Sequence, residues 1–128
     1  ISDANLYKSL TSPLVVPVSL LSNNLKSKFK YLKLLNFGVG IQEDLFEFHK
    51  TGAVIPRLYA VAYALSIATS GNASRILLAG FDGYGPQDRH TKITEHLFSL
   101  YSSCKNARPL LAVTPSIYKI KSTSIYVL

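Results

Sequence analysis

The sequence predicts an α/β domain whose strands form an open, mostly parallel sheet with helices on both faces. Short apolar segments typical of strands alternate along the chain with segments in which apolar residues recur at helical spacing. The 128 residues, 48% of them hydrophobic, suffice for one continuous core and are too few for two domains of ordinary size. We therefore expect residues 1–128 to form a single three-layer domain of the Rossmann-like kind.

The first residues predict a short helix followed by a strand. Asp3 is a suitable N-cap for the helix, and Pro13 would end it. Residues 14–19 are apolar and largely β-branched, which is typical of a strand. Because proline cannot donate a hydrogen bond, Pro17 indicates that this strand lies at an edge or is close to its end.

A second helix and a second strand follow, which completes one β-α-β step. The Ser-Asn-Asn sequence at residues 22–24 can cap a helix over residues 25–31. Residues 32–37 form an apolar segment typical of a strand, which Gly38 and Gly40 would end.

The strongest predicted element is a helix that begins at Pro56 and is stopped by Gly71, since proline is favoured in the first turn and glycine directly after the last. Apolar residues recur inside it at helical spacing, namely Leu58, Val61, Ala62, Leu65 and Ala68. The opposite face includes Ala60 and Ala64, which predicts a helix covered on most sides. Residues 45–49 before it are compatible with a strand or a loop.

The C-terminal half continues the alternation of strands and helices. Residues 75–79 are predicted as a buried strand of the parallel sheet, and residues 91–103 as an amphipathic helix. Residues 110–114 are predicted as a strand closed by Pro115, and residues 124–128 as a final edge strand.

The chain carries an excess of positive charge. Lysine and arginine total 14 and aspartate and glutamate 7, a net charge of +7, which favours anionic partners such as phosphates, nucleotides or acidic glycans. The densest basic run, residues 26–33, contains no arginine, and Leu25, Phe29 and Leu32 have the spacing of a buried helical stripe. We therefore do not expect nucleic-acid binding.

Several other classes are not expected. The longest apolar segment, residues 54–70, is interrupted by Pro56 and Arg57, so we expect no membrane span. The single cysteine, Cys104, excludes an internal disulfide, and a cytoplasmic setting is expected. The sequence starts at Ile1 and contains no methionine, from which we expect a segment of a longer protein.

Ligands of open parallel sheets bind beyond the carboxyl ends of the strands, which selects two loops here. They are residues 80–90, expected to leave a central strand, and residues 114–116. The candidate ligand-binding residues in them are Gly80, Asp82, Gly83, Tyr84, Gly85, Arg89, Thr114 and Ser116. Asp82 can accept from sugar hydroxyls, and Arg89 and His90 would lie at the positive end of a helix. The loop is equally typical of a turn that Asp82 caps for itself.

His90 is the side chain best suited to act as a base near neutral pH, although a solvent-exposed first-turn histidine is the more frequent case. His49 and His96 lack partners at metal-ligand spacing, so no metal is predicted. Cys104 is predicted to lie late in a helix, beside Lys105 and without a recognisable base, and we do not expect a catalytic thiol.

A recognisable pattern extends over much of the chain, at residues 47–49, 55–58, 62–65, 68–71, 76–84 and 111–116. These segments resemble the C-terminal extension of bacterial aldolases whose N-terminal barrel is similar to 3-hydroxy-3-methylglutaryl-CoA lyase and 4-hydroxy-2-oxovalerate aldolase, proteins of surface-polysaccharide pathways. The resemblance implies that lyase chemistry, and any divalent metal, belongs to a barrel of the same chain outside these residues. It implies no cofactor in the domain itself.

Gly80, Asp82 and Tyr84 form the pattern Gly-x-Asp-x-Tyr at the end of a predicted strand. The same pattern occurs in the nucleotide-sugar fold of bacterial sialyltransferases, which the extension resembles. The resemblance implies Tyr84 and His90 as catalytic residues, Tyr84 facing the leaving phosphate and His90 acting as base. Where those transferases begin the preceding helix with Thr-Ser to hold the nucleotide, this chain has Ile-Pro at residues 55–56.

Three functions remain open from the sequence. The first is an accessory, sialyltransferase-like domain of an aldolase that binds a nucleotide, a nucleotide sugar or another anionic ligand. The second is a nucleotide-sugar-dependent glycosyltransferase with His90 as base. The third is a structural module in which exposed rings such as Tyr118 and Tyr126 dock on the barrel. The oligomeric state also stays open, a homo-oligomer included.

Overall fold

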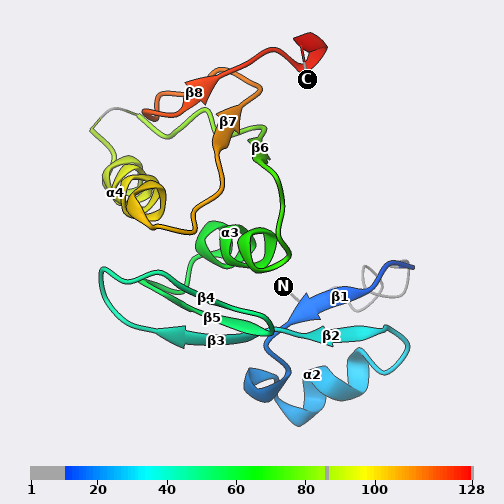
Figure 1. The fold of residues 1–128 in the computed structure, drawn as a ribbon. Helices are drawn as coiled ribbons and strands as arrows, with labels where there is room; N and C mark the ends of the chain where they lie inside the picture. The colour runs from blue at the N-terminus through cyan, green and yellow to red at the C-terminus, as the bar shows by residue number, and fades with distance from the viewer. Residues whose placement is uncertain (1–10, 86, 128) are drawn as a thin grey trace.

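The computed structural model of the chain describes residues 11–85 and 87–127. These residues form an α/β fold in which most strand pairs are parallel (Figure 1). The elements are, in chain order, β1 (Leu14–Val16), η1 (Val18–Leu20), α2 (Asn23–Lys28), β2 (Leu34–Asn36), β3 (Gly38–Ile41), β4 (Glu47–His49), β5 (Gly52–Ile55), α3 (Ala60–Ser70), β6 (Ile76–Leu78), α4 (Arg89–Ser103), β7 (Leu110–Ala112), β8 (Lys121–Ser122) and η2 (Ile125–Val127). The helix predicted near Asp3 lies outside the described residues.

The described strands form three small sheets where the sequence predicts one continuous sheet. β1 pairs with β2, the second sheet has the order β3-β5-β4, and the third has the order β6-β7-β8. The antiparallel pair is β4 with β5, because only Lys50 and Thr51 separate these strands and so short a connection can only reverse the chain.

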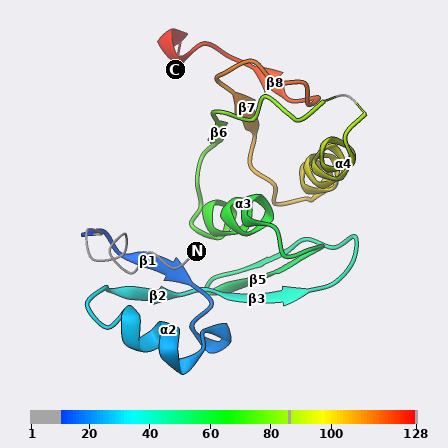
Figure 2. The ribbon, with the colours of Figure 1, turned by 180° about the vertical axis from the view of Figure 1, so that it is seen from behind.

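The helix α3 lies between the β3-β5-β4 sheet and the part of the fold that holds β6, β7, β8 and α4, as both views show (Figures 1 and 2). It packs on β5 through its buried side chains, which are Ala62, Leu65, Ser66 and Thr69. The opposite face is less covered than predicted, since Ala60 and Ala64 are exposed. The helix therefore has one buried face and one face partly open to solvent.

The first residue of α3 is Ala60 and not Pro56, which corrects the predicted start of the helix. The residues of β5 pair with β3 on one side and with β4 on the other, so they belong to a sheet. Pro56 is buried directly after β5, and Tyr59 is the N-cap of α3. Residues 56–59 lie between β5 and α3, and the extended backbone of Tyr59, with φ −110° and ψ 140°, prevents an earlier start of the helix. Proline is tolerated in turns as well as in the first turn of a helix, which explains the error.

Proline and glycine account for two further differences. The first strand stops at Val16 because Pro17 has no N–H for the ladder, and η1 follows. Gly38 does not end a strand but begins β3, where it lies opposite Gly52. A Cβ on Gly52 would lie 3.0 Å from the Gly38 carbonyl oxygen, so glycine allows the two backbones to approach closely here.

The last residues differ from the prediction as well. Residues 125–127 form the 3-10 helix η2, and the last strand of the third sheet is β8, at one of its two edges. Ser124 explains the helical turn, because its carbonyl accepts from Val127 N–H at 3.1 Å and its hydroxyl accepts from Tyr126 N–H at 3.2 Å.

The other predicted elements are confirmed with different bounds: the strands are shorter, α2 starts and ends earlier, and α4 starts two residues earlier, at Arg89. β1 and β2 are parallel and flank α2, whose N-cap Ser22 accepts from Leu25 N–H at 3.3 Å. The segments predicted over residues 75–79 and 110–114 are β6 and β7, which pair in parallel. Residues 91–103 lie in α4, which buries Leu97, Phe98 and Tyr101. No described helix combines the length and apolarity that crossing a bilayer requires.

The core gathers around Tyr101, whose side chain is fully buried. Its ring meets Phe46 and Phe48 edge-on, at centroid distances of 5.5 and 5.9 Å. Its hydroxyl lies 2.6 Å from Thr69 Oγ1 and accepts from Arg108 N–H at 3.0 Å. One side chain of α4 therefore connects the β3-β5-β4 sheet, α3 and the segment that leads to β7.

Substitution of two leucines, Leu65 inside α3 and Leu58 just before it, tests how α3 packs. Leu65 is 1% exposed and Leu58 is 64% exposed. We expect Leu65→Ala to lower the free energy of unfolding by about 2–5 kcal/mol, because it leaves a cavity under the helix. Leu58→Ala should change it by less than about 0.5 kcal/mol. Urea unfolding of both variants measures the difference, and equal losses would contradict the assigned packing face.

Candidate functional site

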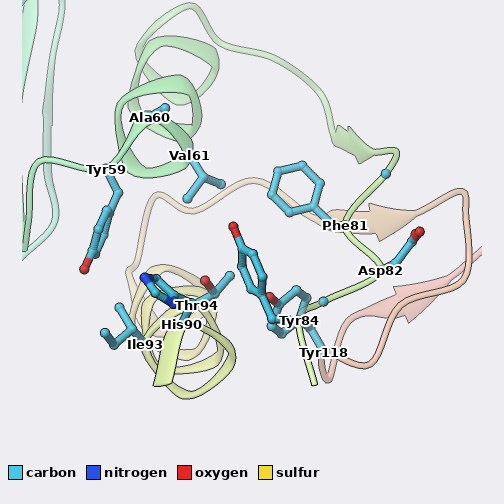
Figure 3. A pocket seen from close by; sticks show the side chains of 12 residues that line it. Tyr59, Ala60, Val61, Phe81, Asp82, Tyr84, His90, Ile93, Thr94 and Tyr118 are labelled. Atoms are coloured by element: carbon cyan, nitrogen blue, oxygen red, sulfur yellow. The ribbon is translucent and has the colours of Figure 1, made fainter. Parts of the chain in front are cut away.

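A pocket of about 530 Å³ lies where the loop after β6 meets the first turns of α3 and α4 (Figure 3). Its size falls within the range of small-molecule sites, roughly 300–1,000 Å³. The residues that line it are Tyr59, Ala60, Val61, Gly80, Phe81, Asp82, Gly83, Tyr84, His90, Ile93, Thr94 and Tyr118. We call it the helix-end pocket, because the N-termini of α3 and α4 both reach it.

The structure brings most of the predicted loop to this pocket. Gly80, Asp82, Gly83, Tyr84 and His90 all line it. The loop leaves the carboxyl end of a parallel strand as predicted, but β6 is an edge strand and β7 is the central one. The cleft beside β6 is therefore formed by helices and the loop itself, without a further strand on that side.

Gly85 and Arg89 are not among the residues that line the helix-end pocket. The carbonyl oxygen of Gly85 accepts from the Thr91 hydroxyl at 3.0 Å and from Asp88 N–H at 2.9 Å. Gly85 thus shapes the turn into α4, and Arg89 is the exposed first residue of that helix.

Thr114 and Ser116 do not line the pocket, but their hydroxyl groups form hydrogen bonds to the backbone of the loop after β6. The Thr114 hydroxyl accepts from Gly80 N–H at 2.9 Å, and the Ser116 hydroxyl donates to the Phe81 carbonyl at 2.6 Å. The Asp82 carbonyl accepts from the backbone N–H of residue 117 at 3.2 Å. The two predicted loops therefore form one unit, which we call the loop clamp.

The loop needs glycine at two of its positions. Gly80 and Gly83 have φ angles of +72° and +97°, in the region that residues with a Cβ rarely adopt. A Cβ on Gly83 would also collide with the side chain of Ile117. The glycines thus set the path of the loop, and the loop clamp fixes it.

Asp88 and His90 form a hydrogen-bonded pair at the start of α4. The Asp88 carboxylate is the N-cap and accepts from the backbone N–H of His90 at 2.7 Å and from its Nδ1 at 2.9 Å. A carboxylate only accepts, so Nδ1 carries the proton and Nε2 is left to meet a ligand. The backbone N–H of His90, and then its side chain, hold the pKa of Asp88 below the ordinary value.

Tyr84 stands next to this pair. Its ring centroid lies 5.4 Å from that of His90 in a tilted arrangement. Figure 3 shows the Tyr84 hydroxyl and the His90 imidazole directed toward α3, while the Asp82 carboxylate points away from both. The two predicted catalytic side chains therefore face the same space, and Asp82 lies at its margin.

The sequence missed the contribution of α3. Tyr59, Ala60 and Val61 line the pocket because the helix begins there, and no side chain caps its first amide groups. A helix that starts at Pro56, as the sequence predicts, would place Tyr59, Ala60 and Val61 inside the helix and not at its N-terminus. The signal that could have found them is β5, because a strand through residue 55 moves the helix start toward Tyr59.

Tyr118 is also placed differently from the prediction. It was expected as an exposed ring for docking, but it is buried and meets Phe98 edge-on at 5.3 Å. Tyr126 is exposed as expected. The ring of Tyr118 therefore belongs to the wall of the helix-end pocket and not to an outer surface.

The remaining titratable side chains form small separate groups. His49 pairs with Glu47 at 3.6 Å, and His96 pairs with Asp44 at 2.9 Å. Within residues 11–85 and 87–127, no three histidine, cysteine or acidic side chains gather as a metal site would require. Burial raises the pKa of the Cys104 thiol, which lowers its reactivity as a thiolate.

The helix-end pocket combines two helix N-termini, aromatic walls and one imidazole. No protein-family model, no curated protein and no solved structure matches the chain. What the pocket binds must therefore be inferred from the chemistry of its walls.

Substitution of two glycines tests the path of the loop. We expect Gly83→Ala to destabilise the protein by about 1–2 kcal/mol, because alanine disfavours a positive φ. Gly85→Ala is the matched control, since a Cβ there would meet nothing within 4 Å. Thermal and urea unfolding should separate the two variants, and a neutral Gly83→Ala would show that the loop adopts another path.

Acid titration tests the N-cap of α4. Because the pKa of Asp88 is lowered in the fold, its stabilising contribution is present above the unfolded value of about 3.9 and is lost as the pH falls through the folded value. Asp88→Asn keeps a capping side chain without the charge. We expect the variant to be less stable than the original chain at pH 6, and the difference to shrink as the pH falls below about 3.9. A difference in melting temperature that is independent of pH would contradict this.

Proposed function

We propose that the helix-end pocket binds a nucleotide or a nucleotide sugar. One observation carries the proposal: the N-termini of α3 and α4 converge with the loop clamp on a single pocket that has aromatic walls. Phosphate suits the helix ends, and flat rings suit a base or a sugar.

The phosphate end of the ligand is assigned to α3. The first amide groups of a helix have no acceptor within the helix, and the helix dipole adds positive potential at the same end. Tyr59 provides no side-chain cap, so the amides that follow it are available to a ligand. At α4 the carboxylate of Asp88 already occupies this position. The net charge of +7 further favours an anionic ligand.

The apolar end of the ligand is assigned to the rings. Tyr59, Phe81 and Tyr84 line the pocket together with Val61 and Ile93. Stacking on such rings accepts many bases, because every base has a π-face. The walls therefore fit a nucleoside better than inorganic phosphate alone.

The finer fold class belongs to the same proposal. β6, α4 and β7 form a β-α-β unit with parallel strands, and the pocket lies at the carboxyl end of β6. This is the position at which Rossmann-like sheets bind nucleotides. We propose that residues 76–112 are the nucleotide-binding half of a fold of this kind.

We further propose that the chain is an accessory domain of a bacterial aldolase of surface-polysaccharide biosynthesis, acting in the cytoplasm. The resemblance of residues 47–84 and 111–116 to the extension of such aldolases supports this. The barrel of the same protein would be the partner, and it would supply the lyase chemistry. Ile125, Tyr126 and Val127 are exposed apolar residues suited to that contact.

The pairing of Asp88 with His90 supports a second candidate, glycosyl transfer from a nucleotide sugar. Nε2 of His90 would take the proton of an acceptor hydroxyl while the new glycosidic bond forms. The bond between the sugar and the phosphate would break, and the Tyr84 hydroxyl would stabilise the departing phosphate. A carboxylate that fixes the tautomer of a histidine is the arrangement that general bases use.

Titration with CMP, UMP and AMP by calorimetry tests the binding proposal. We expect saturable binding of at least one of them. Tyr84→Phe should weaken it about tenfold through the loss of a hydrogen bond to the charged phosphate, and His90→Ala should weaken it less, because Nε2 accepts from a neutral ribose hydroxyl. His96→Ala and Tyr31→Phe are matched controls outside the pocket and should leave the affinity unchanged. Absence of saturation with all three nucleotides would refute the proposal.

Turnover separates the two candidates. Incubation with CMP-sialic acid or a UDP-sugar and an acceptor sugar should give no transfer product if the domain is accessory. Transfer that disappears in His90→Ala and survives in His96→Ala would instead identify a working transferase.

A further inference from the structure

A second pocket, of about 310 Å³, lies at the opposite ends of α3 and α4. The turn between β4 and β5, the last turn of α3 and the segment before β7 form its walls. The lining residues are Phe48, His49, Lys50, Thr69, Ser70, Asn72, Asn106 and Arg108, and none of them is acidic. We call it the basic pocket.

Two buried polar atoms in the basic pocket have no hydrogen-bond partner among the described residues. They are Ser70 Oγ and Arg108 Nε. Buried polar groups are normally paired, and an unpaired N–H of a guanidinium is especially costly because the group is charged. Ser70 and Arg108 both line the basic pocket, so a single ligand there can approach both side chains.

The guanidinium of Arg108 is held in place before any ligand binds. Its Nη2 donates to Asn72 Oδ1 at 2.8 Å, and its backbone N–H donates to the Tyr101 hydroxyl at 3.0 Å. Asn72 itself has a φ of +58°, just after the C-cap of α3. The Asn72 side chain that accepts from Arg108 therefore extends from a backbone position with a positive φ. Nε is a buried donor without a hydrogen-bond partner among the described residues.

The charge around these atoms is positive. His49 is the last residue of β4, Lys50 lies in the hairpin turn, and Arg108 lies in the segment before β7. An acidic side chain, Glu47, lies next to His49, with its carboxylate 3.6 Å from His49 Nε2. Lysine and arginine side chains only donate, and the Ser70 hydroxyl can donate as well. The pocket therefore requires a ligand rich in acceptors.

We propose that the basic pocket binds a small oxyanion, a phosphate group or a carboxylate. Arg108 Nε and the Ser70 hydroxyl donate to its oxygens, and Lys50 supplies the opposing charge. The ends of α3 and α4 that face this pocket carry negative potential, which opposes an anion, and the cations outweigh it at this short range. The site is separate from the helix-end pocket and does not depend on the function proposed for that pocket.

Inorganic phosphate is the probe for this site, titrated by calorimetry and by phosphorus NMR in a low-salt buffer without other oxyanions. We expect saturable binding that Ser70→Ala and Lys50→Gln each weaken about tenfold, as the loss of one charge-assisted hydrogen bond predicts. Lys50 is exposed and Ser70→Ala removes only one hydroxyl, so both variants should fold. Arg108→Gln should abolish binding, and its unfolding transition reports whether it folds.

Two controls separate this proposal from simpler explanations. Arg75→Gln removes a positive charge outside the pocket and should leave the phosphate affinity unchanged, whereas an effect equal to that of Lys50→Gln would mean diffuse surface charge. His90→Ala should also leave it unchanged, since a loss there would place the phosphate in the helix-end pocket. No saturation throughout the millimolar range, or full affinity in Ser70→Ala, would overturn the proposal and leave Arg108 with a structural role.

Discussion

The fold depends on the hydrogen bonds of one buried hydroxyl group. Thr69 uses its hydroxyl proton on the Leu65 carbonyl at 2.7 Å, so Tyr101 must donate to Thr69 and its oxygen accepts from Arg108 N–H. The chain of donors runs from Arg108, in the segment before β7, through Tyr101 of α4 to Thr69 of α3, and every step is buried or partly buried. A network of this kind is costly to disturb, because a missing member leaves a polar group unpaired in the core. The ring of Phe48 in β4 and the ring of Phe46, just before this strand, pack against Tyr101.

Much of the secondary structure could be predicted from local patterns, and the errors share a cause. α4 has a clear helical period and an N-cap, and β6 and β7 are apolar runs of strand length, so their positions were predictable. β5 was missed because its residues are small and apolar, a composition equally typical of a helix, and only its partners on both sides make it a strand. The division into three small sheets was also beyond the sequence, because strand pairing is decided by contacts between distant residues.

The candidate site shows the same division between local and distant information. Gly80 and Gly83 could be identified because glycines that permit positive φ angles are a local signal, and His90 because it lies in a first turn, whereas the role of Tyr84 rests on the resemblance to sialyltransferases. The roles of Thr114 and Ser116 could not be separated from ligand binding, since their hydroxyls serve the loop clamp from 34 and 35 residues away. The basic pocket left no signal at all. Lys50, Ser70 and Arg108 are unremarkable where they stand in the chain, and only folding brings them together.

The position of α3 has a mechanical consequence. Its 11 residues span about 16 Å, with one pocket at its first turn and the other at its last. A packed helix moves as a rigid rod, because close-packed interiors barely compress. Any axial sliding of this rod would narrow the space at one end and widen it at the other by the same amount. A ligand in one pocket would then change the space available in the other pocket through the displacement of α3 alone.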